Sequence, residues 1–337
     1  MSLILPESID LQFGNETVLP KGFSVGHAQD VAAATGCTAI IHENGAVGAV
    51  SVRGAAPATI ETDLLEPRNT VERINAVLLS GGSAFGLEAA SGVMRWLSEH
   101  KAGFEVSGSI VPIVCGASIF DLTLGEGEVF PDKDMGYAAC ESATTRMLTG
   151  NVGAGTGASV GKMFGEAFSM KSGLGCASTC FGELVVAALA VVNAVGNVYD
   201  RTSGKAIAGV RDPENPSSIL DPYQAFLIMD SVMDKAPTIP ENTTISCVLT
   251  NGTLTKAQAT HVADMAHDGY ARAIEPVHTG FDGDTVFVLA SGMFPCSSDL
   301  IGILAARVIE AAIHVAATSA KAAYGLPSAF ELSASLA

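Results

Sequence analysis

The sequence predicts a globular α/β protein whose strands and helices share one large hydrophobic core, in one domain or in two closely packed ones. Composition is the first reason, because 48% of the 337 residues are hydrophobic and only 16% are charged. Periodicity is the second, because some apolar segments have the two-residue spacing of strands and others the spacing of helices. The 36 glycines are the third, since they indicate close backbone packing.

Three strands and one helix are predicted in the N-terminal part. The strands are "TAIIHENGAVGAVSVRG" (38–54), "NAVLLSG" (75–81) and "ELVVAALAVVNAVGNVYD" (183–200), which are apolar runs of the strand type. Between the last two lies Phe85–His100, where apolar residues recur at helical spacing. Strand and helix patterns thus alternate along this part of the chain.

The C-terminal part repeats this alternation. "TTISCVLTNG" (243–252) and "DTVFVLASG" (284–292) are predicted strands, and Thr255–Ile274 and Leu300–Tyr324 are predicted helices. The first of these strands alternates hydroxyl-bearing or small residues with apolar ones, as a half-buried strand does. Before it, Arg211–Glu241 is rich in Pro, Asp and Ser and is predicted to be a linker.

No segment is expected to cross a membrane. The apolar run Leu184–Gly196 is too short, and Leu300–Tyr324 contains ionisable residues, which are Arg307, Glu310, His314 and Lys321. The N-terminus "MSLILPESIDLQFGNE" has acids where a signal peptide has a basic region. We therefore expect a cytoplasmic protein.

The net charge of −17, from 35 acids and 18 bases, argues against nucleic acid as a partner. No cluster of Lys and Arg is visible, and an acidic surface favours cationic substrates. The seven cysteines lie mostly in apolar surroundings, as reduced core thiols do. Cys176 and Cys180 lack a second Cys/His pair at the distance of a zinc site, so no metal or cofactor is expected.

Glycine-rich motifs suggest three other enzyme classes. "GAGTGA" (153–158) fits a dinucleotide-binding pattern, but no apolar strand precedes it. "TGASVGK" fails the phosphate-loop pattern at Thr156 and Met163. "GASVG" matches the nucleophile elbow of α/β-hydrolases around Ser159, although no strand runs into it. The simpler interpretation of all three is a close-packed Gly/Ala loop.

The junction before Thr243 has two interpretations. Asn242 and Thr243 are ordinary residues for a turn that leads into a strand. The alternative is that the chain is cut there and that Thr243 becomes a new N-terminus. A threonine hydroxyl needs a base beside it, and the α-amine of an N-terminal residue has a pKa of about 7.7–8.0, against about 10.4 for lysine. One residue would then supply both the nucleophile and the base.

Long motifs in a consistent order carry a resemblance to a known family. They include "AVLLSGGSAFGLEAASGVMRWL", "GASVGK", "VVNAVGNVYD", "NTTISCVLTN" and "HTGFDGDTVF". Together they resemble the DmpA/P1 family of self-processing aminopeptidases and amidases, which also contains the nylon-oligomer hydrolases. The resemblance implies an αββα sandwich of the DmpA/ornithine acetyltransferase type with an N-terminal nucleophile. It also implies a single domain over residues 1–337, cut into chains 1–242 and 243–337, and a homotetramer or larger assembly.

The same resemblance assigns the residues that carry the chemistry. It marks the Asn242–Thr243 bond for autocleavage and Thr243 as the nucleophile. Lys162, in "GASVGK", falls on a lysine beside the nucleophile, where a buried ammonium lowers the pKa of the amine and polarises the hydroxyl. Asp282 and Asp284, in "FDGDT", fall on carboxylates that orient this lysine and the new amine.

The substrate pocket is assigned in the same way. Asn193, in "VVNAVG", falls on an oxyanion donor, a role that suits a neutral amide. Phe120 stands where several family members have a tyrosine, so this chain lacks one hydroxyl donor. Gly82 and Ser83, in "SGGSAFG", open the predicted helix, and two interpretations stay open: their backbone amides line the pocket, or the motif is only a tight strand-to-helix turn.

The resulting expectation is an N-terminal-nucleophile hydrolase that releases N-terminal residues from small peptides or amides, with 6-aminohexanoate oligomers as a further substrate class. Thr243 would attack the substrate carbonyl, and water would then hydrolyse the acyl-enzyme. Two alternatives remain open. One is an acyltransferase of the ornithine acetyltransferase type, and the other is a catalytically silent assembly protein of the same fold.

Overall fold

The computed structural model describes residues 10–232 and 242–335, in which two stacked β-sheet layers lie between two pairs of helices. One long strand, β3 (Thr35–Val52), belongs to both layers. Its last residues pair with β17 (Thr285–Phe294), and its first residues pair with β2 (Ser24–Asp30) and β5 (Arg73–Ser80). The register shifts between Ile41 and Ala46, so the strand changes layer at that point.

The layers follow the order β1-β11-β12-β15-β17-β3 and β3-β5-β8-β4, with β2 paired to β3. β15 and β17 run parallel, whereas β12 and β15 run antiparallel. The remaining strands of the two layers have these bounds: β1 Leu11–Phe13, β11 Leu174–Phe181, β12 Leu184–Asn193, β15 Thr243–Gly252, β8 Val114–Ser118 and β4 Ala58–Ile60.

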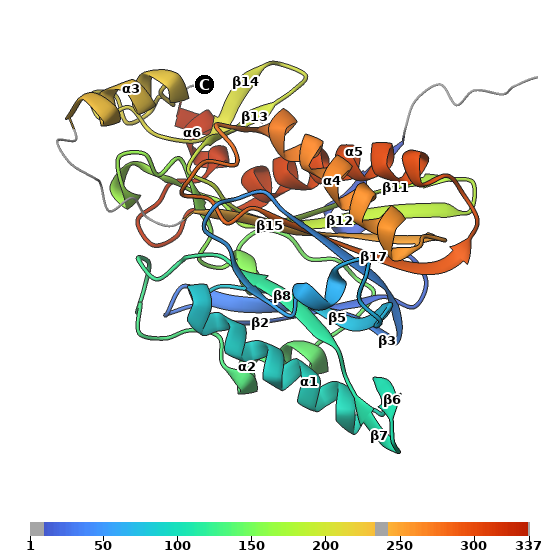
Figure 1. Cartoon of the computed structure of the whole chain (residues 1–337). Helices are drawn as coiled ribbons and strands as arrows, with labels where there is room; N and C mark the ends of the chain where they lie inside the picture. Colours follow the sequence, from blue (N-terminus) through green and yellow to red (C-terminus); the bar gives the residue numbers. More distant parts are fainter. Residues whose placement is uncertain (1–9, 233–241, 336–337) are drawn as a thin grey trace, which may run out of the picture.

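Helices α4 (Lys256–Ala273) and α5 (Ser298–Ser319) cover the outer face of the first layer, and α1 (Ala89–Glu99) and α2 (Lys133–Glu141) cover the second (Figure 1). Thr255 begins α4 with a capping box, in which its side chain accepts from Gln258 N and the Gln258 side chain accepts from Thr255 N. The architecture is therefore the αββα sandwich that the resemblance implied.

Side-chain alternation explains how the layers pack. On β15, Ile245, Cys247 and Leu249 point into the core between the two sheets, where they meet residues such as Leu79 and Phe287. Val248, on the opposite face of the same strand, joins the core under α4 and α5. The two-residue period predicted for this strand thus arises because alternate side chains face the other sheet and the helix pair.

Smaller elements complete the described chain. α3 (Pro222–Val232) projects away from the sandwich (Figure 1). The others are β6 Phe104–Val106, β7 Ser109–Val111, β9 Ser159–Val160, β10 Met170–Lys171, β13 Asn197–Asp200, β14 Lys205–Ala208, β16 Ile274–Glu275 and α6 Ala329–Ser335. Five short 3₁₀ helices are η1 Gly14–Glu16, η2 Asp63–Leu65, η3 Ser83–Glu88, η4 Gly153–Gly155 and η5 Glu166–Phe168.

The predicted elements are present, with three differences. The predicted strand 183–200 is two strands, β12 and β13, because the chain turns after Asn193. The predicted helix from Phe85 begins as the 3₁₀ helix η3 and becomes α-helical only at Ala89. The predicted linker 211–241 contains helix α3, and its residues 233–241 lie outside the described residues.

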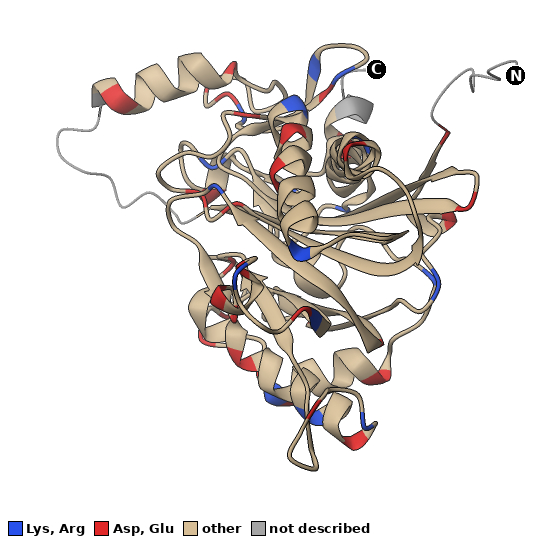
Figure 2. Cartoon of the chain, turned by 45° about the vertical axis from the view of Figure 1, so that its right-hand side comes forward, with Lys and Arg blue, Asp and Glu red and all other residues tan. Residues whose placement is uncertain are grey.

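Helix α5 has the length and mean hydropathy (1.8) of a membrane span, yet 67% of its most apolar window is buried inside the protein. It packs on β11, β12 and α4 as a core helix does. Charged residues lie mainly on helices and loops around the sheets (Figure 2). The buried acids and bases among the described residues are Asp121, Lys162, Lys171, Lys256, Asp282 and Asp284.

Candidate active site

Three strand ends bring the predicted site residues together. Thr243 is the first residue of β15, and Asp284 immediately precedes β17, which runs parallel to β15 and so begins at the same edge of the sheet. Asn193 is the last residue of β12 and lies directly opposite Thr243 in the register. All three residues are buried.

The peptide bond between Asn242 and Thr243 is held at this edge by the segment that precedes β17. Asn242 N donates to Phe281 O at 2.9 Å, and Gly283 N donates to Asn242 O at 2.8 Å. The Thr243 hydroxyl donates to the same Asn242 oxygen at 2.5 Å. A Cβ atom at Gly283 would lie 2.8 Å from Thr243 Oγ1, so this position requires glycine for the close approach.

Asp282 and Asp284 face different donors. Asp284 accepts from Thr244 N at 2.8 Å through Oδ1, and from His278 Nδ1 at 2.7 Å through Oδ2. Asp282 accepts from Thr279 N at 2.8 Å and from Thr279 Oγ1 at 2.6 Å. Burial, together with the charge of Asp284, raises the pKa of Asp282 to about 6. The Asp282 carboxyl is therefore harder to ionise than an exposed one.

Lys162 binds Asn193, the residue that lies opposite Thr243 in the strand register. Its Nζ donates to Asn193 Oδ1 at 2.5 Å, and its main-chain N donates to Val195 O at 3.2 Å. The side chain is buried, and desolvation lowers its pKa, opposed by the charges of Glu166, Asp121 and Asp282. The Lys162 side chain thus lies inside the protein and not on its surface.

Asn193 has its amide orientation fixed by its neighbours. Oδ1 accepts from Lys162 Nζ and from Ser159 N, the latter at 3.1 Å, so the oxygen faces the two donors. Nδ2 donates to Phe120 O at 3.0 Å. One of the two N–H bonds of Nδ2 is thus engaged, and the described residues provide no acceptor for the other.

Gly82 and Ser83 form a tight turn after β5, with φ values of 76° and 53°. Their amides have partners within the chain, because Gly82 N donates to Asp121 Oδ1 at 2.7 Å and Ser83 N donates to Ile119 O at 2.9 Å. The turn therefore shapes its surroundings without presenting these two N–H groups to a ligand. Desolvation raises the pKa of the buried Asp121 carboxyl to about 6.

Ser159 lies in the short strand β9 and not on a strand-to-helix turn, so the nucleophile elbow is absent at this position. Its hydroxyl donates to Glu166 Oε1 at 2.7 Å. This partner is a carboxylate, whereas the serine of a nucleophile elbow is bound to an imidazole base. The nearby Gly153–Gly155 segment is the 3₁₀ helix η4, as expected of a close-packed loop.

Several residues at the site were not predicted from the sequence. They are Asp121, Glu166, Lys171, Gly283, His278 and Thr279. The last three stand in the quoted motif "HTGFDGDTVF", so a signal for them was present. No comparable signal marked the others, because their role depends on contacts between distant segments.

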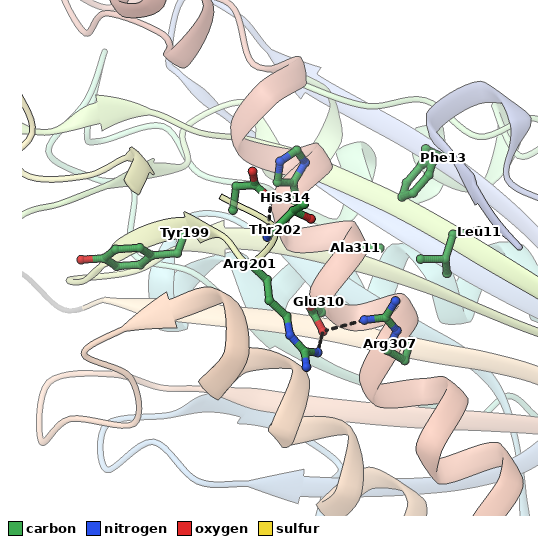
Figure 3. Close-up of a pocket in the computed structure, with 10 residues that line it drawn as sticks. Leu11, Phe13, Tyr199, Arg201, Thr202, Arg307, Glu310, Ala311 and His314 are labelled. Atoms are coloured by element: carbon green, nitrogen blue, oxygen red, sulfur yellow. Dashed lines mark hydrogen bonds and ion pairs between the residues drawn. The ribbon is translucent and has the colours of Figure 1, made fainter. Parts of the chain in front are cut away.

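One cavity of about 380 Å³ lies between α5, β1 and the turn after β13, and none of the site residues lines it. Arg201 and Arg307 both approach Glu310 there, at 3.3 Å and 3.7 Å (Figure 3). Two guanidinium groups thus share one carboxylate. Within the described residues, no group of three or more His, Cys, Asp or Glu side chains is placed to hold a metal ion.

Comparison with known proteins agrees with this geometry. The model of Peptidase family S58 matches residues 20–326. An uncharacterized aminopeptidase of Mycobacterium leprae is 40% identical, over 87% of this chain and 85% of the relative. A 6-aminohexanoate-oligomer endohydrolase of Paenarthrobacter ureafaciens is 32% identical, over 80% of this chain and 73% of the relative.

Solved structures show the same fold. The L-aminopeptidase D-Ala-esterase/amidase of Ochrobactrum anthropi, described as a variant of the Ntn hydrolase fold, superposes with a TM-score of 0.68 at 17% identity, covering 94% of this chain and 89% of that one. A Burkholderia sp. beta-aminopeptidase gives 0.64 at 18% identity, with 97% and 96% covered. The chain belongs to peptidase family S58 and is a hydrolase of amide bonds with the Ntn hydrolase fold.

Proposed function

We propose that the protein cuts its own chain between Asn242 and Thr243 and then uses the new N-terminal Thr243 to hydrolyse amides. The observation that carries this proposal is the geometry of the junction. The Asn242 carbonyl oxygen accepts from Gly283 N at 2.8 Å and lies 2.5 Å from the Thr243 hydroxyl oxygen. The bond to be cut is thus already next to its nucleophile and to a donor that stabilises negative charge on its oxygen.

The self-cleavage step follows from this arrangement. Thr243 Oγ bonds to the Asn242 carbonyl carbon, and the oxyanion that forms accepts the N–H of Gly283. The C–N bond then breaks, and the hydroxyl proton ends on the Thr243 nitrogen. Water hydrolyses the resulting ester, which yields an Asn242 carboxyl group, the free Thr243 hydroxyl and the free α-amine.

Substrate hydrolysis uses the same groups. The Thr243 amine takes the hydroxyl proton as Oγ attacks the substrate carbonyl, and it passes that proton to the leaving amine. Asn193 offers its second N–H to the oxyanion. The ammonium of Lys162 lies one hydrogen bond from Asn193 and lowers the pKa of the neighbouring amine by like-charge repulsion. Water then releases the acyl group.

The substrate class rests on the relatives and on charge. The names of the relatives describe aminopeptidases and a 6-aminohexanoate-oligomer endohydrolase, whose substrates carry amide bonds and free amino groups. A net charge of −17 attracts such cationic molecules. We therefore propose small peptides and amino-acid amides as substrates, processed by a cytoplasmic homotetramer or larger assembly of chains 1–242 and 243–337.

The experiment is a comparison of two single variants. Thr243→Ala is expected to remain one chain and to be inactive, because it has neither the hydroxyl nor a new amine. Ser159→Ala is expected to be cut and to keep most of its activity on an amino-acid amide. The opposite pattern, an active Thr243→Ala enzyme and an inactive Ser159→Ala enzyme, would contradict the proposal.

The product decides between hydrolysis and acyl transfer. With an amino-acid amide and no added acceptor, free acid is expected to accumulate at neutral to mildly alkaline pH, where the Thr243 amine is unprotonated. Mass spectrometry with and without excess ornithine measures both products. If product forms only in the presence of ornithine, the protein is an acyltransferase and the proposed hydrolase function is wrong.

A further inference from the structure

The motif "HTGFDGD" contains two residues that the proposed mechanism leaves without a role, His278 and Thr279. They are consecutive, and each contacts a different carboxylate of the site: His278 binds Asp284, and Thr279 binds Asp282. We propose that the dipeptide His278–Thr279 is a positioning element that orients both carboxylates and thereby supports turnover at Thr243. This inference rests on the proposed function and deepens it.

His278 binds one oxygen of Asp284 twice. Its main-chain N donates to Asp284 Oδ2 at 3.1 Å, and its ring Nδ1 donates to the same oxygen at 2.7 Å. Since an ionised carboxylate only accepts, Nδ1 carries the hydrogen in this contact. The other oxygen, Oδ1, accepts from Thr244 N, directly after the nucleophile. Asp284 thus links the position of the ring to the start of β15.

The backbone conformation of His278 has a cost in free energy. Its φ is +55°, which is uncommon for a residue other than glycine. Conformations of this kind cost of order 1–3 kcal/mol and persist where the surroundings enforce them. The positive φ lets the main-chain N and the ring Nδ1 of one residue meet the same carboxylate oxygen, which explains why it is retained here.

Helix α4 holds the imidazole ring in place. The His267 ring lies edge-on to it, with centroids 4.8 Å apart, and the Tyr270 ring stacks at 5.8 Å. Tyr270 is itself fixed, because its hydroxyl donates to Thr244 O at 3.1 Å. The side chain of His278 is 19% exposed, so little water competes for its bond to Asp284. The ring is therefore preorganised as a donor.

Thr279 does the same for Asp282. Its main-chain N and its hydroxyl both donate to Asp282 Oδ2, and its carbonyl accepts from Asp282 N at 3.2 Å. Phe281, between them, accepts the N–H of Asn242. The turn that fixes Asp282 therefore also carries the contact to the bond that is cut. Loss of the hydroxyl would remove one of the two Thr279 donors that fix Asp282 Oδ2 while leaving the turn in place.

The test uses paired variants that keep or remove each donor. Asn tolerates positive φ and offers an amide N–H near the place of Nδ1, whereas Gly tolerates positive φ without a donor. We expect His278→Gly to lower kcat on an amino-acid amide by roughly 10- to 100-fold, with KM nearly unchanged, and His278→Asn to recover most of this loss. Likewise, Thr279→Val should lose turnover, and Thr279→Ser should restore it.

The control is His27→Gln. It alters a half-buried ring that binds Thr38 Oγ1 at 3.0 Å in the other sheet layer, and it leaves His278, Thr279 and both carboxylates untouched. We expect it to lower the Tm while kcat stays near that of the wild type. Equal losses in His278→Asn and His278→Gly, or normal turnover in His278→Gly and Thr279→Val, would overturn the inference. A wild-type chain that is neither cut nor active would contradict the proposed function instead.

Discussion

Two lysines are buried in neighbouring regions, and their ammonium groups are bound differently. Lys171, at the end of β10, donates to three main-chain carbonyl oxygens, those of Gly155 at 3.2 Å, Ala158 at 2.8 Å and Ser172 at 2.6 Å. Lys162 donates to one acceptor among the described residues, Asn193 Oδ1. Desolvation lowers the pKa of both, that of Lys171 to about 7.

The difference lies in the donors that remain. An ammonium group has three N–H bonds, and Lys171 has used all of them to hold the glycine-rich loop. Lys162 uses one of them among the described residues, and we expect the other two to serve groups that change during the proposed reaction. Burial and a lowered pKa therefore do not distinguish a structural lysine from a reactive one, whereas the number of engaged donors does.

The largest expected effect separates these two lysines directly. Lys162→Met should lower kcat by roughly 10²- to 10⁴-fold with little change in KM, because it removes a charge that tunes the Thr243 amine. Lys171→Met should mainly lower the free energy of unfolding, by about 2 kcal/mol or more, because three buried carbonyls lose their donor. Steady-state kinetics and urea unfolding on both variants measure the contrast.

Either of two results would break this comparison. Near wild-type turnover in Lys162→Met would leave that lysine with a structural role only. A Lys171→Met enzyme of normal stability with a strongly reduced kcat would show that the loop lysine takes part in the chemistry.

The next effect concerns pH. The pKa of Asp282 is raised to about 6, so at pH values below 6 this carboxyl takes up a proton and no longer stabilises the Lys162 ammonium. Protonation of the Thr243 amine already lowers kcat/KM as the pH falls, and we expect an additional fall of about tenfold per pH unit below about 6. Asp282→Asn should lower the activity and remove this additional fall. If the fall of kcat/KM below about pH 6 is the same in Asp282→Asn as in the wild type, a group other than Asp282 causes it.

The raised pKa of Asp282 also predicts how the stability of the fold changes with pH. Because the folded-state pKa of Asp282 lies above its ordinary value of 3.8, the folded chain binds more protons between about pH 3.8 and 6. This group therefore favours the folded state at low pH, and that contribution is lost as the pH rises through the window. Asp121 has the same shift, so Asp121→Asn should change the stability profile and leave the acid limb of activity in place.

The smallest expected effect concerns the turn at Gly82. Asp121 accepts from Gly82 N at 2.7 Å and from Thr35 Oγ1 at 2.9 Å. Asp121→Ala should lower the free energy of unfolding by about 2–3 kcal/mol, because two buried donors lose their acceptor, and Asp121→Asn should cost less. Chemical unfolding checks both. An alanine variant as stable as the wild type would mean that water replaces the carboxylate.

Periodicity in the sequence predicted the central strands β3, β5, β12, β15 and β17 and the helices α1, α4 and α5, whereas the sandwich itself was implied by the resemblance. The strand at 243–252 has its predicted bounds. Its hydroxyl-bearing or small residues alternate with apolar ones, which is the pattern of a half-buried strand. The run at 183–200 was predicted as one strand, since the apolar pattern passes through a turn at Ala194–Gly196 whose conformation depends on contacts with the Lys162 loop. Helix α3 was missed because Pro, Asp and Ser flank it.

The site was predictable only where motif and resemblance coincide. Thr243, Lys162, Asn193, Asp282 and Asp284 were named from such motifs, and the structure brings them to one edge of the sheet. Lys171 and Asp121 carry no local signal. Asp121 accepts from the main-chain N of Gly82, and Lys171 donates to the carbonyl oxygen of Ala158. These contacts join separate loops, and the spacing of residues in the sequence does not predict them.

The central claim is that the chain is cut before Thr243 and works through the new N-terminus. The direct measurement is intact-mass analysis and N-terminal sequencing of freshly purified, active wild-type protein. Given a mass of 34.4 kDa for the whole chain, we predict two chains of roughly 25 and 10 kDa, the smaller beginning Thr-Thr-Ile. A single uncut chain that hydrolyses amides at full rate would contradict the account.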